Sequence, residues 1–163
     1  QKICERAPKL SDTITYANSA IAADAAGFVV LVSENFLKNR MLKGIEVLDS
    51  ATSGVLPEEA PLAPAGAMKK LLDQTEVRLS NLNFIELMEA YAAQAILCSR
   101  ICDLDLDIVN IRGGALSRGH PIGASGAILV VRLFNELIKT AGKFGMAAIA
   151  AAGGIGSAIM LKS

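Results

Sequence analysis

The sequence lacks a net charge and any long apolar run. Its 16 basic and 16 acidic residues give a formal net charge of zero, so no global field attracts nucleic acid or an acidic membrane surface. No uninterrupted apolar stretch approaches the roughly 18 residues that a membrane span needs. No charged segment followed by an apolar stretch opens the chain. We therefore expect no nucleic-acid partner and no membrane partner, and we expect a cytoplasmic protein.

Cysteine is scarce as well. Cys4, Cys98 and Cys102 are odd in number, which does not suggest the disulfide framework of a secreted protein. Cys98 and Cys102 are four residues apart and would share one face of a helix, which leaves a metal site open as an interpretation. The alternative is a pair of packed, unreactive thiols, which fits the lack of a second cysteine pair. We predict no metal site.

Internal repeats, low-complexity tracts and a dinucleotide-binding pattern are also missing. The glycine clusters do not combine the spacing G-x-G-x-x-G with a preceding strand and an acidic ribose ligand, so we expect no nicotinamide cofactor. The 163 residues are 52% hydrophobic, which is enough for a substantial core. We expect residues 1–163 to form a single domain.

Short apolar runs alternate with helical segments, which predicts an α/β layered fold. Strands are expected at residues 25–33, 45–48, 108–111, 146–151 and 157–162. Residues 82–87 fit either a short strand or an approach loop. Helices are expected at residues 65–74, 89–101 and 123–140. The last helix has almost no charge in its first half, so we expect it to be covered on most sides.

The only histidine lies in a glycine-framed loop, which reads GGALSRGHPIGASG over residues 113–126. Histidine has an unperturbed pKa of roughly 6.5 and therefore exchanges protons near neutral pH. Pro121 fixes the backbone after His120, and Gly119 permits backbone angles that a side chain would forbid. Two interpretations are open: a hydrogen-bonded structural histidine, or a base that the loop presents rigidly to a substrate.

Three motifs resemble the thiolase family in order and spacing. From Asn110 onward the loop resembles the family's Asn-x-x-Gly-Gly-Ala run leading into Gly-His-Pro-x-Gly-Ala-Ser/Thr-Gly. Residues 89–94, EAYAAQ, resemble its Asn-Glu-Ala-Phe-Ala helix start. Residues 150–156, AAAGGIG, stand in the place of its Cys-x-Gly-Gly-Gly-x-Gly hairpin. The resemblance covers only the C-terminal half of a thiolase, because the family's acylated cysteine belongs to an N-terminal half that this chain does not contain.

This resemblance implies an α/β fold, one half of the thiolase sandwich, with a five-stranded mixed sheet and helices on both faces. It also implies an acyl-CoA acyltransferase of the acetyl-CoA acetyltransferase type, so a coenzyme A thioester is the expected substrate and no bound cofactor is expected. By resemblance, His120 would activate the nucleophilic cysteine and help to bind the thioester oxygen. The backbone of Gly119 and Ala152 would contribute to the oxyanion sites.

Several positions depart from the family pattern. Ala150 stands where the family has its second cysteine, and a methyl group cannot exchange a proton. Met88 stands where the family has an asparagine that holds a water, and a thioether is a weak acceptor and no donor. Ala152 replaces a glycine and resists positive φ. Ala20 and Ile21 stand where many members carry serine and glycine near the CoA arm, so they are weaker substrate-binding candidates.

We interpret the chain as the C-terminal domain of a thiolase-like acyltransferase with a degenerate acid/base site, inactive alone. Its expected partners are an N-terminal half or a second copy of the chain, together with acyl-CoA. The alternatives are a non-catalytic thiolase-fold binding or assembly subunit and an active enzyme completed by a separate half. Arg112 and Arg118 are additions to the pattern that fit solvated charges, a phosphate or an acidic partner. Because no methionine precedes Gln1, we do not expect it to be the true start.

Overall fold

The computed structural model describes residues 6–163, so Cys4 lies outside the described residues. Short 3-10 helices, labelled η, alternate with α-helices and strands. In chain order the elements are η1 (Tyr16–Asn18), α2 (Glu34–Arg40), β1 (Glu46–Gly54), η2 (Pro57–Leu62), α3 (Ala63–Thr75), η3 (Leu79–Asn81), β2 (Phe84–Leu87), α4 (Ala92–Ile101), η4 (Leu106–Ile108), α5 (Ala115–Arg118), α6 (Ser125–Thr140), β3 (Phe144–Ala151) and β4 (Ile155–Lys162).

The strands form one mixed sheet in the order β1-β4-β3-β2. β4 pairs antiparallel with β1 on one side and with β3 on the other, whereas β2 pairs parallel with β3. In this register Leu87, the last residue of β2, lies beside Ala148 of β3. The C-terminal ends of the parallel strands β2 and β3 therefore lie at the same end of the sheet.

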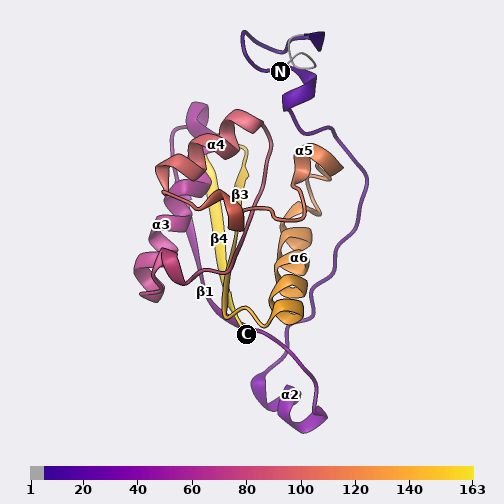
Figure 1. The fold of residues 1–163 in the computed structure, drawn as a ribbon, viewed down its shortest axis with the longest axis vertical. Helices are drawn as coiled ribbons and strands as arrows, with labels where there is room; N and C mark the ends of the chain where they lie inside the picture. The colour runs from indigo at the N-terminus through magenta and orange to yellow at the C-terminus, as the bar shows by residue number, and fades with distance from the viewer. Residues whose placement is uncertain (1–5) are drawn as a thin grey trace.

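Helices cover both faces of the sheet, as Figure 1 shows. On one face Met68 and Leu71 of α3 are fully buried in a cluster that α4 completes. On the other face Leu129, Leu133 and Leu137 of α6 are buried against β2, β3 and β4. These leucines are spaced i, i+4 and i+8, which places them on one side of a helix. The expected α/β layering is therefore confirmed.

The expected number of strands is wrong, because the sheet has four strands and not five among the described residues. Residues 25–33 are extended but pair with no strand there, and Phe28 and Val30 are 86% and 85% exposed. Residues 108–111 also form no strand: Ile108 ends η4, whose first turn is capped by the carboxylate of Asp105 accepting the N–H of Asp107 at 3.0 Å, and Asn110 has φ 48°. One isolated parallel bridge between Ile85 and Val109 remains.

The remaining predicted elements are confirmed. The other expected strands are present as β1, β3 and β4, residues 82–87 contain the short strand β2, and the expected helices are α3, α4 and α6. No helix within residues 6–163 is long and apolar enough to cross a membrane.

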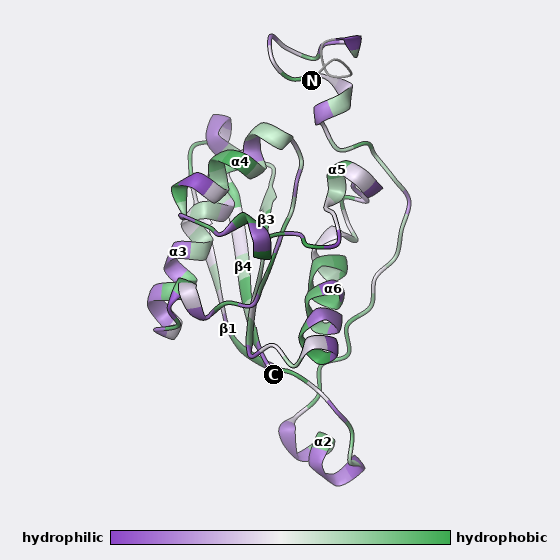
Figure 2. Cartoon of the chain, in the orientation of Figure 1, coloured by the Kyte–Doolittle hydropathy of each residue, from purple (hydrophilic) through white to green (hydrophobic). Residues whose placement is uncertain are grey.

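The outer side of α6 is partly covered by the chain's own N-terminal segment. Residues 25–28 run along it, and a Cβ added to Gly27 would lie 3.1 Å from the Cβ of Ala127. Near its N-terminus α6 is therefore enclosed between the sheet and this segment, as its apolar composition predicts. Figure 2 shows that the apolar character continues along residues 25–32, and no residue of the described range 6–163 forms a layer outside them.

Candidate functional site

The His120 loop is fastened to the end of β2 by Asn110. Its amide oxygen accepts the N–H of Leu87 at 2.9 Å, and its amide nitrogen donates to the carbonyl of Leu87 at 2.9 Å. The side chain thus takes the place of a neighbouring strand. Asn110 has φ 48°, a left-handed conformation that asparagine tolerates better than most residues. This conformation turns the chain from η4 into the loop.

Glu89 holds the next part of the loop. One of its carboxylate oxygens accepts from the amide of Asn110 at 2.6 Å, and the other accepts the N–H of Leu116 at 3.1 Å. A Cβ on Gly114 would overlap this carboxylate, so a larger residue there would displace Glu89 from these hydrogen bonds. Gly114 thus leaves room for the carboxylate of Glu89, which ties the loop to Asn110.

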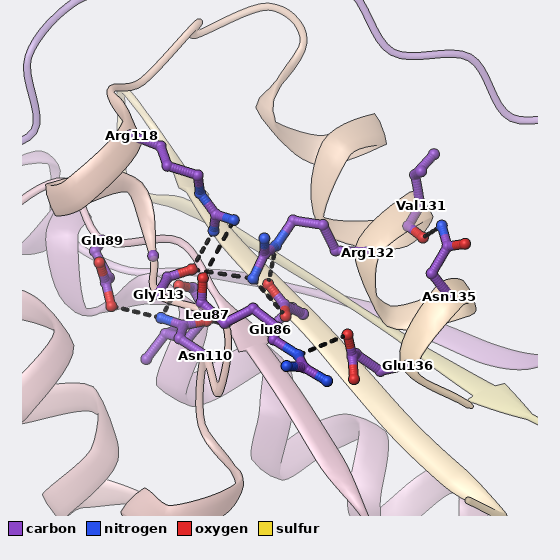
Figure 3. Close-up of polar contacts among 12 residues, drawn as sticks. Glu86, Leu87, Glu89, Asn110, Gly113, Arg118, Val131, Arg132, Asn135 and Glu136 are labelled. Atoms are coloured by element: carbon purple, nitrogen blue, oxygen red, sulfur yellow. Dashed lines mark hydrogen bonds and ion pairs between the residues drawn. The ribbon is translucent and has the colours of Figure 1, made fainter. Parts of the chain in front are cut away.

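An ion pair lies behind the loop, between β2 and α6 (Figure 3). Arg132 donates to both carboxylate oxygens of Glu86, from Nε at 2.7 Å and from Nη2 at 3.0 Å. Nη2 also donates to the carbonyl of Gly113 at 3.0 Å. Burial raises the pKa of Glu86, and this rise is partly offset by Arg132. Arg132 therefore links β2, α6 and the beginning of the loop.

Arg112 and Arg118, which are additions to the family pattern, lie at the margin of this network. Arg118 donates to the carbonyl of Gly113, and the Nε of exposed Arg112 donates to the Oε1 of Glu136 at 3.2 Å. Glu136 is 5% exposed, and its Oε2 has no hydrogen-bond partner among the described residues. Both arginines thus bind groups of this chain, which favours a structural interpretation of their charges.

On its other side the loop contacts the N-terminal segment. The backbone N–H of His120 donates to the carbonyl of Ile21 at 2.7 Å, and the N–H of Ala20 donates to the carbonyl of Ala90 at 2.9 Å. Gly119 has φ 94°, and a Cβ there would lie 2.6 Å from the Cβ of Ala23. The structure therefore places the backbone of Ile21 against His120 and Gly119, whereas Ala20 is hydrogen-bonded to Ala90.

The imidazole of His120 is half-buried. Its Nδ1 lies 2.7 Å from the hydroxyl of Ser125, at the first turn of α6. Burial lowers the pKa of His120 below its ordinary value of 6.5. The ring is therefore neutral at pH 7, and a neutral imidazole is the form that accepts a proton.

The β3–β4 hairpin reaches the same end of the sheet as the His120 loop (Figure 1). A 16-residue helix at 1.5 Å per residue and an eight-residue strand at ~3.3 Å per residue have nearly equal lengths. Because α6 and β3 are joined by a short turn, the start of α6 lies level with the end of β3. That end carries Ala150, which pairs with Gly156.

In the turn of this hairpin, Ala152 does not need a positive φ angle. The positive φ angles, 85° and 88°, fall on Gly153 and Gly154, and Ala152 is not among the residues with positive φ. A Cβ on Gly154 would overlap the carbonyl of Val55, so the second glycine also permits a close approach to Val55, which directly follows β1. The expected difficulty at Ala152 therefore does not arise.

Met88 lies in the core. It is 4% exposed and packs in the apolar cluster that includes Leu129, Leu133 and Ala147. Its N–H donates to the carbonyl of Ala148 at 2.9 Å, which continues the ladder of β2 and β3. The thioether is thus enclosed by apolar side chains and does not line an open cleft, which differs from the expected orientation.

The two described cysteines are packed thiols. The Sγ of Cys98 donates to the carbonyl of Pro61 and that of Cys102 to the carbonyl of Ala65, both at 3.5 Å. Burial raises the pKa of Cys98, and it raises the pKa of Cys102 to about 11. Both thiols are therefore protonated at neutral pH, which makes them poor nucleophiles and poor metal ligands. Within residues 6–163 no group of three or more potential ligands surrounds a common point.

An open hollow of about 500 Å³ adjoins the site. Its walls are residues 23–28 of the extended segment and residues 121–124, which directly follow His120. The exposed side chains of Phe28 and Ile122 are part of this lining. The hollow therefore opens beside the loop and is largely apolar.

Sequence reasoning assigned no role to Glu86, Arg132 or Ser125. A signal for the ion pair was available, since Glu86 is the only charge in strand FIEL and Arg132 the only one in the first ten residues of α6. A single buried charge is costly, so two such charges on neighbouring apolar elements predict a pair. Ser125 offers no comparable signal, because a serine at the start of a helix is common.

Known proteins share this fold and much of this sequence. The family model "Thiolase, C-terminal domain" matches residues 43–163. The beta-ketoadipyl-CoA thiolase of Acinetobacter baylyi is 37% identical over 157 residues, which cover 94% of this chain and 39% of that protein. The chain thus spans about two fifths of the length of such relatives.

Solved structures agree with the sequence comparison. The crystal structure of the Bacillus anthracis acetyl-CoA acetyltransferase superposes with a TM-score of 0.94 and 30% identity, covering 99% of this chain and 42% of that one. Human mitochondrial 3-ketoacyl-CoA thiolase in complex with CoA superposes with a TM-score of 0.87 and 28% identity, covering 96% of this chain and 41% of that one. This chain belongs to the thiolase family, and its residues 43–163 are the thiolase C-terminal domain.

Proposed function

We propose that the chain contributes the general base of an acyl transfer between coenzyme A thioesters, with His120 as that base. The observation that carries the proposal is the state of His120. The loop holds the ring through Ser125 and the backbone through Ile21, and burial lowers the pKa so that the neutral, proton-accepting form is present at pH 7. The CoA complex of the human relative supports a CoA thioester as substrate.

We further propose that turnover requires an N-terminal half that carries the nucleophilic cysteine. Both described cysteines are buried and have raised pKa values, so neither is suited to attack a thioester. The exposed apolar residues 28–32 favour a protein surface that covers them. The length of the relatives is consistent with such a half.

The acid/base site is incomplete in this proposal. A second proton-transferring group typically contributes ~10²–10⁴-fold, and Ala150 cannot supply it. The backbone N–H groups of Gly119 and Ala152 remain as oxyanion candidates, and Ala20 and Ile21 as neighbours of the CoA arm. A non-catalytic assembly subunit is the second candidate, favoured by Ala150 and by the buried Met88.

The test is thiolysis of acetoacetyl-CoA by the purified chain, beside its His120→Ala variant. We expect no rate above that of buffer from either protein. Turnover that His120→Ala abolishes would overturn the requirement for a second half, because the chain would then contain its own nucleophile. Turnover that survives His120→Ala would indicate a contaminating enzyme.

A further inference from the structure

The hydroxyl of Ser125 lies between two polar atoms of the His120 loop. Its Oγ is 2.7 Å from the Nδ1 of His120 and 3.0 Å from the carbonyl oxygen of Pro121. Ser125 is 3% exposed, so solvent has little access to this hydroxyl. The contacts of His120 with Ser125 therefore depend on the protein and not on exchangeable water.

Counting hydrogens decides the direction of these bonds. A serine hydroxyl carries one hydrogen, and the carbonyl of Pro121 carries none, so the contact between the two oxygens requires the hydrogen of Ser125. Helical serines commonly donate to the carbonyl four residues earlier, which is the position of Pro121. If Ser125 instead donated to His120, two oxygens would face each other at 3.0 Å with no hydrogen between them. Ser125 therefore accepts, and the Nδ1 of His120 donates.

From this geometry we infer that Ser125 is a positioning residue, which holds neutral His120 as its Nδ1–H tautomer and leaves the lone pair of Nε2 free. The role of Nε2 as a base rests on the proposed function, whereas the tautomer itself rests on the hydrogen-bond geometry. Neutral histidine in water prefers the opposite tautomer, with the hydrogen on Nε2, and in that form Nε2 cannot accept a proton. Ser125 thus selects the tautomer that a general base at Nε2 requires.

The proton balance of the step is simple. The S–H bond of the incoming cysteine breaks, an Nε2–H bond forms, and a thiolate and an imidazolium result. The Nδ1–H of His120 continues to donate to Ser125 throughout, because both ring nitrogens of imidazolium are donors. No proton passes to Ser125, whose role is limited to holding the ring.

The test is ¹⁵N NMR of the uniformly labelled chain, above the pKa of His120. Because His120 is the only histidine, its two ring nitrogens give unambiguous signals. We expect a pyrrole-type shift for Nδ1 and a pyridine-type shift for Nε2. Ser125→Ala should change the ratio of the tautomers toward Nε2–H by roughly fivefold or more, the factor that one neutral hydrogen bond provides. Ser125→Thr, which keeps the hydroxyl, should restore the Nδ1–H form.

Ser117→Ala is the matched control. The hydroxyl of Ser117 donates to the carbonyl of Gly114 at 2.9 Å in the same loop and leaves His120 untouched, so its removal should not change the tautomers. A pyrrole-type Nε2 in the unmodified chain would overturn the inference, whether or not the variants fold. An unchanged ratio in a Ser125→Ala variant with normal circular dichroism would also overturn it. The measurement needs no substrate or second half, so it is independent of the proposed acyl transfer.

Discussion

The guanidinium of Arg132 binds both carboxylate oxygens of Glu86, at 2.7 and 3.0 Å, in a nearly closed site between β2 and α6. Glu86 is 2% exposed, so the loss of Arg132 would leave a buried carboxylate without a partner. We therefore expect Arg132→Met to lower the free energy of unfolding by about 3–5 kcal/mol, measured by urea denaturation.

Two further variants distinguish the effect of breaking the ion pair from the effect of simply losing a positive charge. Arg118→Met removes an exposed arginine that donates to the same carbonyl of Gly113. It should lower the free energy of unfolding by less than about 1 kcal/mol. The double variant Glu86→Leu/Arg132→Met should regain most of the lost stability, because no buried charge remains. An Arg132→Met protein as stable as the Arg118→Met protein would contradict this account.

His120 should make stability depend on pH in a defined direction. Burial lowers its pKa below 6.5, so the folded chain releases the proton more readily than the unfolded chain. The contribution of His120 to the free energy of unfolding therefore rises as the pH increases from the lowered pKa to about 6.5, and it is complete above that value. We expect this rise to be absent from His120→Gln when both proteins are denatured at a series of pH values.

The ring protons of His120 provide an independent check. Their NMR titration midpoint should lie below 6.5. A midpoint at or above 6.5, or a stability difference between the two proteins that falls with increasing pH, would show that burial does not control this group.

Met88 should not tolerate the asparagine of the family pattern. Its side chain is enclosed by Leu129, Leu133 and Ala147, where an amide would lose its water without gaining partners. We expect Met88→Asn to cost about 1–3 kcal/mol of stability, and Met88→Leu, which keeps the site apolar, less than about 1.5 kcal/mol. Equal stability of the two variants in chemical denaturation would mean that position 88 faces water.

The apolar segment outside α6 should make the isolated chain self-associate. Phe28 and Val30 are 86% and 85% exposed, and such surfaces rarely remain uncovered. We expect oligomers in analytical ultracentrifugation at high micromolar concentration, with an interface of at least ~1,000 Å². The variant Phe28→Ser/Val30→Ser should be monomeric, whereas Lys139→Ser should not change the assembly. An unmodified chain that sediments as a monomer would contradict the expectation.

Much of the fold is readable from the sequence, because its signals are local. The i, i+4, i+8 leucines of α6 and the apolar strands around the glycine turn at residues 152–154 identify α6, β3 and β4 directly. The apolar composition of residues 25–33 equally predicts a buried strand. Burial requires neighbouring layers, however, and among residues 6–163 only α6 packs against this segment, on one side. Composition alone does not show on which sides a segment is covered.

In the candidate site, too, local features are readable from the sequence and features that depend on tertiary contacts are not. The glycine-framed loop around His120 is readable because its motif lies within a short stretch of sequence, whereas the contact of His120 with Ile21 joins residues far apart in sequence. The pairing of Glu86 with Arg132 joins residues far apart in sequence, and the burial of Met88 depends on how α6 packs. Those features depend on tertiary packing, which the residue types indicate only indirectly.

The most direct test of the central claim is a chimera. Residues 6–163 would replace the structurally equivalent C-terminal part of the Bacillus anthracis acetyl-CoA acetyltransferase, with which they superpose at a TM-score of 0.94. The measurement is thiolysis of acetoacetyl-CoA by the folded chimera, with and without His120→Ala. The account predicts turnover that falls at least about 100-fold in the variant, because His120 is the base. A folded chimera with no turnover, or with turnover that His120→Ala leaves unchanged, would contradict it.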